Sequence, residues 1–297
     1  MKKTIALALA LVLLLTCSAA LAEKVKIGKK VFPDLQFRKY VKAVADVNKD
    51  GWLTDGEIRS VSSMDCSNRK ITSLKGVEIF TSLEYLNCEH NELTELDMSL
   101  NTKLEELYCG WNSLKKLDVS GNTELTNLYC GYNQLTKLNV SKNVNLEFFG
   151  CYFNRLKKLN VSKNTKLIQL HCNNNRLAEL NVKKNTELTA ISCYGNKLTA
   201  LDLRKNLNLE RLYCYDNQLT ELNVTKNTKL QVLDCFSNQL KELDIRKNKV
   251  LLKLIKGKVP TMLYEPRYGW WETEKQGDHD IIVRSLFFDK DVKLITK

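Results

Sequence analysis

A cysteine and two asparagines recur every 21 residues through most of this chain, and this period constrains the fold more than any other feature. The unit that starts at Leu83 reads L-x-x-L-x-C-x-x-N-x-L and continues to a second asparagine at Asn101. Segment 83–250 holds eight such units without an insertion. The cysteines are Cys88, Cys109, Cys130, Cys151, Cys172, Cys193, Cys214 and Cys235. One unit buries too little apolar surface to fold alone, so the period predicts a solenoid in which neighbouring units stack into one core.

The pattern resembles the leucine-rich repeat, with cysteine where that family usually has leucine. The resemblance implies an α/β solenoid, a horseshoe in which each L-x-C segment adds one strand to a parallel sheet. The return path of about ten residues is short, so we expect a mostly non-helical convex side. Both asparagine ladders are expected to turn inward and satisfy backbone groups that the turns leave unpaired. The resemblance is specific for fold and weak for function.

The chain divides into four predicted segments: a signal peptide (1–22), an N-terminal cap (23–60), the repeats (61–258) and a C-terminal cap (259–297). The basic start, the apolar run Ile5–Leu15 and the small residues Ala20 and Ala22 are typical of a secretory signal cleaved after Ala22. That run is short for a membrane span, so no transmembrane segment is expected. A lipid anchor at Cys17 is the alternative, although Thr16 fits a lipoprotein motif poorly. We therefore expect a secreted protein.

Segment 46–57, DVNKDGWLTDGE, matches the EF-hand calcium loop at each required place. The resemblance implies one structural Ca²⁺, with Gly51 at the sharp turn. Its ligands would be the side chains of Asp46, Asn48, Asp50, Thr54 and Glu57 and the carbonyl of Trp52. The alternative is a degenerate loop that folds without metal.

The residues around this loop predict a helix–loop–helix cap over the apolar end of the solenoid. Helical spacing within 31–45 places Phe37, Tyr40, Val41 and Val44 on one face, and a second helix is expected at 57–62. Calcium sensors and the dockerin modules of cellulose-degrading assemblies carry two such loops, so a single loop favours a cap. The order of cap and repeats resembles secreted leucine-rich proteins of Gram-positive bacteria, internalin-like in a loose sense.

The C-terminal boundary is marked by a break in the repeat pattern. Segment 251–257 resembles the start of a ninth unit, with Lys256 at the cysteine position. The strand-like runs 281–288 and 292–295 then predict a small β cap that covers the end of the sheet.

Nine cysteines follow the predicted signal peptide, and their spacing argues against disulfides. Equivalent residues on adjacent parallel strands point the same way, so their Cβ atoms stay about a strand spacing apart, too far for a disulfide. No CxxC pair accompanies them, so an iron–sulfur or metal ladder is disfavoured. We expect reduced thiols that act as small apolar core residues.

Aromatic residues are concentrated at the outward strand positions, which would face the concave side. These positions lie three and one before each cysteine and one and two after it, and twelve of the 32 are aromatic, against 8% of the whole chain. The twelve are Tyr85, Tyr108, Trp111, Tyr129, Tyr132, Phe148, Tyr152, Phe153, Tyr194, Tyr213, Tyr215 and Phe236. Such residues dominate binding hot spots, which predicts a module that binds a protein or, alternatively, a glycan. We expect this module to be monomeric and non-enzymatic. Stacking that merely stabilises the sheet is the other interpretation. No catalytic motif is present in the sequence.

Basic residues are concentrated on the return path, and the formal net charge is +12. One repeat position carries Lys142, Lys163, Lys184, Lys205, Lys226 and Lys247. These residues predict either a solvated convex surface or a structural, cell-envelope component held electrostatically by anionic wall polymers or acidic lipids. Nucleic acid is disfavoured because no recognition motif supports it.

Overall fold

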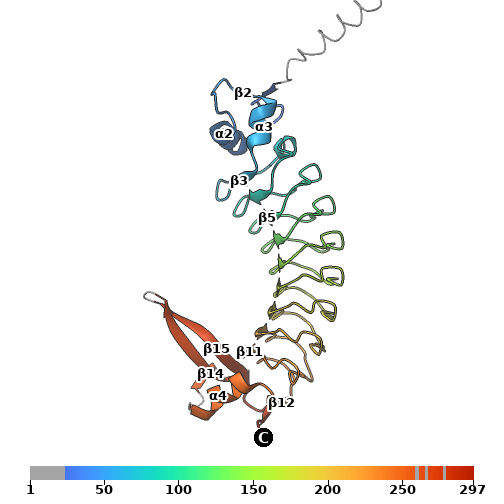
Figure 1. Ribbon diagram of the computed structural model, residues 1–297, viewed down its shortest axis with the longest axis vertical. Helices are drawn as coiled ribbons and strands as arrows, with labels where there is room; N and C mark the ends of the chain where they lie inside the picture. Colours follow the sequence, from blue (N-terminus) through green and yellow to red (C-terminus); the bar gives the residue numbers. More distant parts are fainter. Residues whose placement is uncertain (1–23, 258–260, 265–266, 277–278) are drawn as a thin grey trace, which may run out of the picture.

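The computed structural model describes residues 24–257, 261–264, 267–276 and 279–297, and the predicted signal peptide lies outside them. The chain forms an elongated, gently curved solenoid with two short helices at one end and a long hairpin at the other (Figure 1). No helix within the described residues is long and apolar enough to cross a membrane.

The repeats build one parallel sheet along the concave side. Its strands are β3 (Ser63–Asp65), β4 (Tyr85–Asn87), β5 (Glu106–Tyr108), β6 (Asn127–Tyr129), β7 (Phe148–Gly150), β8 (Gln169–His171), β9 (Ala190–Ser192), β10 (Arg211–Tyr213) and β11 (Val232–Asp234). From β4 to β11 the register follows the sequence period, as where Leu107 lies opposite Leu128. Across residues 63–234, all of which are described, the only helix on the return path is the 3-10 helix η1 (Val77–Ile79). The predicted horseshoe with a mostly non-helical convex side is confirmed.

The core consists of stacked leucines and cysteines. Cys88 to Cys235 are fully buried free thiols, and so is Cys66, as the spacing predicts. Burial raises the pKa of these thiols, to about 12 for Cys130 and Cys172. The cysteines therefore pack as uncharged apolar residues.

The first asparagine ladder connects neighbouring turns, as predicted. Asn154 donates from Nδ2 to the carbonyls of Cys130 and Cys151, at 3.0 and 3.2 Å, and its Oδ1 accepts from the Leu135 amide at 2.9 Å. The second ladder donates in the same way: Asn164 Nδ2 lies 2.9 Å from the Val140 carbonyl oxygen and 2.8 Å from that of Asn143. Each unit is therefore hydrogen-bonded to the preceding one on both sides of the core.

Replacing Asn154 by alanine is expected to lower the free energy of unfolding by about 2–4 kcal/mol, because it leaves buried backbone groups of two units unpaired. Asn145 provides a matched control, since its side chain makes its hydrogen bonds at the surface, to Thr123 and Lys166. The Asn145→Ala change should cost no more than about 0.5 kcal/mol. Urea titrations of the two variants measure the difference, and equal midpoints would contradict the role assigned to the ladder.

The N-terminal cap contains α2 (Leu35–Val44) and α3 (Asp55–Ser60), with β1 (Val25–Lys26) antiparallel to β2 (Trp52–Leu53). Phe37, Tyr40 and Val41 are buried as predicted. The prediction that Val44 shares this face is wrong, because Val44 is 47% exposed and the buried Ala45 completes the face instead. The second helix begins two residues earlier than predicted because Thr54 caps it, with its Oγ1 accepting from the Glu57 amide at 3.1 Å.

One carboxylate joins this cap to the solenoid. Asp34 Oδ1 accepts from the Phe37 amide at 2.8 Å and so caps α2. Its Oδ2 accepts from the amide and hydroxyl of Thr72 in the first, irregular unit, at 2.9 and 2.8 Å. The helix and the first unit are therefore held in one arrangement.

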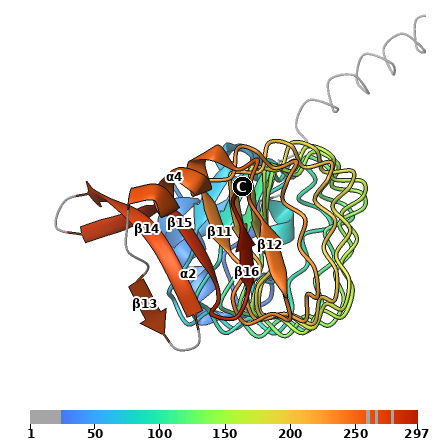
Figure 2. The same ribbon diagram turned by 90° about the horizontal axis from the view of Figure 1, so that it is seen from below.

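The C-terminal end differs from the prediction. Segment 251–257 does not begin a ninth unit but belongs to α4 (Lys249–Gly257). The chain continues through β13 (Thr261–Tyr264), β14 (Arg267–Gln276) and β15 (His279–Asp289), and β15 pairs in parallel with β11. Leu286 lies opposite Leu233, so β15 occupies the position that the strand of a ninth regular unit would take after the eight strands β4 to β11. Near the end of the chain β16 (Lys293–Ile295) pairs with β12 (Glu242–Asp244) on the return side, and Figure 2 shows both pairs at the end of the solenoid.

Asp289 completes this closure. Its Oδ1 accepts from the Ser237 amide at 2.7 Å and its Oδ2 from the Asn238 amide at 3.1 Å. In the interior units the equivalent amides donate to carbonyls of the next unit, as the Asn217 amide does to Ser237. A single carboxylate therefore replaces the backbone that a further unit would supply.

Candidate functional sites on the concave face and in the N-terminal cap

The residue two places after each ladder cysteine has a left-handed backbone conformation. The φ angle is 54° at His90, 48° at Trp111, 51° at Tyr132 and 48° at Phe153. This conformation costs non-glycine residues on the order of 1–2 kcal/mol, and Asn tolerates it better than bulky side chains do. The chain nevertheless places three large aromatic residues there in consecutive units, whereas the following unit has Asn174.

These four rings form one continuous stack. Ring centroids lie 4.5 Å apart for His90 and Trp111, 4.6 Å for Trp111 and Tyr132, and 4.2 Å for Tyr132 and Phe153, with interplanar angles of at most 17°. An open groove of about 750 Å³ lies along the stack and also contacts Lys70 and Arg155. We call it the aromatic groove and define it by His90, Trp111, Tyr132 and Phe153. Because neighbouring rings cover one another's faces, the exposed parts of the inner rings are mainly their edges.

A fifth ring fixes this stack from one side. Tyr152 meets Trp111, Tyr132 and Phe153 edge to face, at centroid distances of 6.1, 5.8 and 6.4 Å. A Cβ atom on Gly131 would lie 2.5 Å from the Tyr152 ring, so this close approach requires glycine in the turn that follows β6. The aromatic groove is therefore preorganised by the packing of its rings against Tyr152.

The other predicted aromatic residues lie elsewhere on the sheet. Tyr108 and Tyr129 stack at 5.3 Å with Tyr85 beside them, and a further stack joins Tyr194, Tyr215 and Phe236 at 4.2 and 4.8 Å. Phe148 and Tyr213 are half-buried on β7 and β10. The twelve residues thus include separate stacks and do not form one uniform surface. His90 was missed by the count of aromatics, although it occupies the same repeat position as Trp111.

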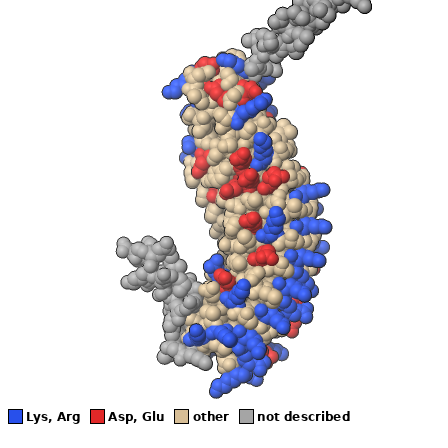
Figure 3. Space-filling view, viewed as in Figure 1, with Lys and Arg blue, Asp and Glu red and all other residues tan. Residues whose placement is uncertain are grey.

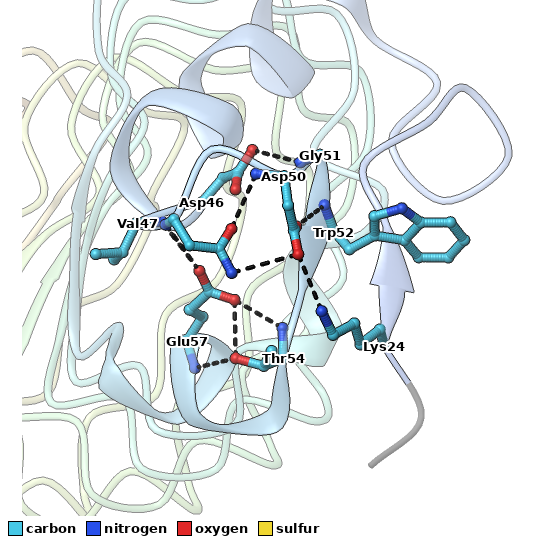
Figure 4. Close-up of polar contacts among 9 residues, drawn as sticks. Lys24, Asp46, Val47, Asp50, Gly51, Trp52, Thr54 and Glu57 are labelled. Atoms are coloured by element: carbon cyan, nitrogen blue, oxygen red, sulfur yellow. Dashed lines mark hydrogen bonds and ion pairs between the residues drawn. The ribbon is translucent and has the colours of Figure 1, made fainter. Parts of the chain in front are cut away.

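The predicted calcium loop is held by its own side chains (Figure 4). The Gly51 amide donates to Asp46 Oδ2 at 3.1 Å, the Asp50 amide to Asn48 Oδ1 at 2.9 Å, and the Trp52 amide to Asp50 Oδ1 at 2.8 Å. Gly51 has a φ of 81°, as the sharp turn requires. These bonds direct the oxygens of three predicted ligand residues towards the inside of the loop.

Glu57 and Asp50 use their carboxylates in protein contacts. Glu57 accepts from the Thr54 amide at 2.9 Å and the Val47 amide at 3.0 Å, and the bonds from Thr54 are the main cause of its lowered pKa. Asp50 Oδ2 lies 2.9 Å from Lys24 Nζ, which is the main cause of its lowered pKa. Both groups are therefore ionised at neutral pH.

The loop fits a calcium ion in the identity of its residues and in having a buried carboxylate oxygen without a hydrogen-bond partner among the described residues. Asp46 Oδ1 is buried and has no hydrogen-bond partner among the described residues, as expected of an atom placed to bind a cation. Three His, Cys, Asp or Glu side chains do not converge on one point anywhere in the described part of the chain. Binding would therefore require Glu57 and Asp50 to exchange present partners for the ion.

No protein-family model matches the chain. Internalin J of Listeria monocytogenes serotype 4b is 40% identical over 71 residues, which are 24% of this chain and 8% of that protein. The solved functional domain of InlJ from Listeria monocytogenes, described as including a cysteine ladder, superposes with a TM-score of 0.75 at 38% identity. This chain has the leucine-rich-repeat fold and is similar to the internalins. The InlJ match covers 78% of this chain and 51% of the InlJ chain, so the internalin-like chain spans about half of that domain.

A second internalin, InlF of Listeria monocytogenes, agrees with this fold. Its structure superposes with a TM-score of 0.64 at 21% identity and covers 78% of this chain and 77% of its own. At that identity the likeness concerns the fold of the internalin-like chain alone.

Proposed function

We propose that this internalin-like chain is an extracellular, non-enzymatic module that binds another protein through the aromatic groove. The observation that carries the proposal is the placement of Trp111, Tyr132 and Phe153 at a left-handed position of the repeat that later units fill with Asn, Gly, Asp or Ser. Strain of this kind is concentrated at functional sites, where a geometry needed for binding is retained despite its cost. The leader-like residues 1–22 support the extracellular setting.

The orientation of the rings favours a protein over a glycan. Sugars bind aromatic platforms through an exposed ring face, but the inner faces of this stack are covered at centroid distances of 4.2–4.6 Å. Trp111, Tyr132 and Phe153 are 36–39% exposed. Their edges, together with the indole N–H and the phenol O–H, suit aromatic side chains and backbone carbonyls of a protein partner.

The proposal is tested by screening residues 23–297 against extracellular proteins and a glycan array, at low and moderate salt. A variant with Trp111→Asn, Tyr132→Asn and Phe153→Asn is screened beside the wild type. A protein ligand that survives salt and is lost in the variant supports the proposal. A glycan ligand lost in the variant, or a protein ligand that the variant retains, would overturn it.

We further propose that the loop at 46–57 binds one structural calcium ion that stabilises the cap. Asp46, Asn48, Asp50, Thr54 and Glu57 would supply side-chain oxygens, and Trp52 its carbonyl. A bound ion would neutralise the carboxylates of Asp46, Asp50 and Glu57 in this loop.

Calcium at about 100 times its dissociation constant is expected to stabilise the protein by about 2.7 kcal/mol relative to chelator, if only the folded state binds it. The melting temperature with and without EDTA measures the effect. Asp46→Asn is the matched control, because an amide oxygen can still accept from the Gly51 amide while the charge is lost. Equal melting temperatures for the wild type in calcium and in EDTA would show that the loop folds without metal.

A further inference from the structure

The six lysines at one repeat position form a row along the convex side. The row consists of Lys142, Lys163, Lys184, Lys205, Lys226 and Lys247, and all six side chains are exposed. Each directly precedes a second-ladder asparagine, such as Asn143 or Asn164, which is fully buried and hydrogen-bonded to the preceding unit. Figure 3 shows blue side chains gathered along this edge of the solenoid. The ladder therefore fixes the spacing of the backbone that carries these charges.

The charges of this lysine row are not neutralised by the protein. Neighbouring basic residues pair with the nearby acids: Lys183 and Arg204 contact Asp202 at 3.2 and 2.7 Å, and Arg246 contacts Asp244 at 2.8 Å. None of the six lysines takes part in an ion pair among the described residues. Asp202 and Asp244 are thus paired with these other basic groups, and the six lysines of the row have no ion-pair partner among the described residues.

We propose that this lysine row is a binding surface for a linear phosphodiester polymer, which lies along the convex side with about one phosphate for each unit. Successive units are about 4.8 Å apart at the concave sheet and further apart on the convex side, a spacing that an extended chain of single phosphates can follow. Lysine carries a compact charge on a flexible arm, which suits a series of single anionic groups. A flat lipid surface fits less well, because the row runs along a convex edge and would touch a plane over only part of its length (Figure 1).

The surface is separate from the aromatic groove. The groove lies on the concave side, and the lysine row lies on the return path of the units from 125–145 to 230–250. One chain could therefore be held by a polymer while its groove remains open to another protein.

The test measures binding of residues 23–297 to poly(glycerol phosphate) by calorimetry at several salt concentrations. Each phosphate contact contributes a slope of about −0.7 to the logarithm of the affinity against the logarithm of salt, so six contacts predict about −4. Raising salt from about 50 to about 200 mM should then weaken binding roughly 300-fold. A variant with all six row lysines changed to glutamine should lose both the binding and the salt dependence.

The matched control removes the same charge elsewhere. It changes Lys29, Lys30, Lys39, Lys42, Lys115 and Lys116 to glutamine, all of which are exposed and outside the row. This control should retain most of the affinity, and circular dichroism of both variants should show the folded protein. Equal losses in the two variants would overturn the proposal by showing that only net charge matters. Tighter binding to vesicles of anionic lipid than to the polymer would also overturn it, in favour of a membrane surface.

Discussion

Raising the pH from 7 to 10 in the presence of reductant is expected to unfold this protein sharply, with a midpoint near pH 9.5, because of its cysteine ladder. An unfolded cysteine has a pKa of about 8.5. In the folded chain burial raises that pKa to about 12 at Cys66, Cys130 and Cys172, and well above its usual value at the other six. Above pH 8.5 the unfolded state loses thiol protons that the folded state retains, so the free energy of unfolding falls as pH rises.

The size of this effect follows from the number of thiols. Each contributes about 1.4 kcal/mol per pH unit between its unfolded and folded pKa values, so nine thiols give about 12 kcal/mol per unit. A domain is typically stable by about 5–15 kcal/mol, and one pH unit therefore removes most of the stability. Half-buried tyrosines such as Tyr152, whose pKa is raised to about 12 by desolvation, add to the loss only above about pH 10, where unfolded tyrosines ionise.

Far-UV circular dichroism during a pH titration measures the transition. A variant with Cys109→Ala, Cys130→Ala and Cys151→Ala removes three of the nine thiols, and the dependence of stability on pH should become a third less steep. Urea titrations at pH 7 and 9 give the free energy of unfolding at each pH. They separate its dependence on pH from the pH-independent loss of stability caused by the smaller alanine side chains. A wild-type protein that keeps its stability to pH 10 would contradict the assignment of these residues as buried, protonated thiols.

The Trp111→Asn, Tyr132→Asn and Phe153→Asn variant is expected to lose partner affinity roughly 1000-fold while its stability changes by no more than about 2 kcal/mol. The affinity falls because three adjacent aromatic contacts of hot-spot type disappear together. Stability is preserved by opposing effects: stacking worth about 0.5–1.5 kcal/mol for each pair is lost, but the cost of left-handed aromatic residues is relieved. Asn174, with a φ of 51° at the same repeat position, shows that the fold accepts asparagine there.

Urea unfolding and calorimetric binding of the same samples provide the measurement. A control variant with Tyr194→Ala and Tyr215→Ala removes a second stack, in which the centroids lie 4.2 Å apart outside the aromatic groove. That control should bind the partner normally. Loss of binding only where the protein also unfolds would assign the rings a purely structural role.

The ladders could be predicted from sequence because each depends on one repeat position and one spacing. Cys130 and Asn154 are buried, and the Asn154 side chain donates a hydrogen bond to the Cys130 carbonyl, as the period implies. Every unit presents the same groups to its neighbours. The end of the chain follows no such rule. The apolar run at 251–257 continues the pattern of leucines, but no asparagine follows it, and it forms a helix. The strand at the position of a ninth regular unit comes instead from β15, some 50 residues after β11 in the sequence, a distance at which no repeat relates the two.

The sequence could predict which aromatic residues lie on the concave side, but not how their rings are arranged. Counting aromatics identified Trp111 and Tyr132, but the left-handed backbone that aligns them is a property of the turn and not of the residue type. The same count could not separate the groove from the stack of Tyr194 and Tyr215, nor include His90. The candidate calcium loop could be proposed from the sequence because its predicted ligands are close together in the chain, whereas the bond from Lys24 to Asp50 depends on the pairing of β1 with β2.

The strict period also bears on how such a protein can change its length during evolution. Hydrogen bonds of the first ladder connect residues 19 or 24 apart, and those of the second connect residues 21 or 24 apart. Removing or duplicating any stretch of 21 residues therefore brings equivalent donors and acceptors together again, wherever the new junction falls within the unit. Unequal recombination between the stretches of its gene that encode these units could thus yield longer or shorter folded descendants in a single event. Each event would move the two ends of the molecule about 4.8 Å further apart or closer together, so reach is a property that selection can adjust in uniform steps.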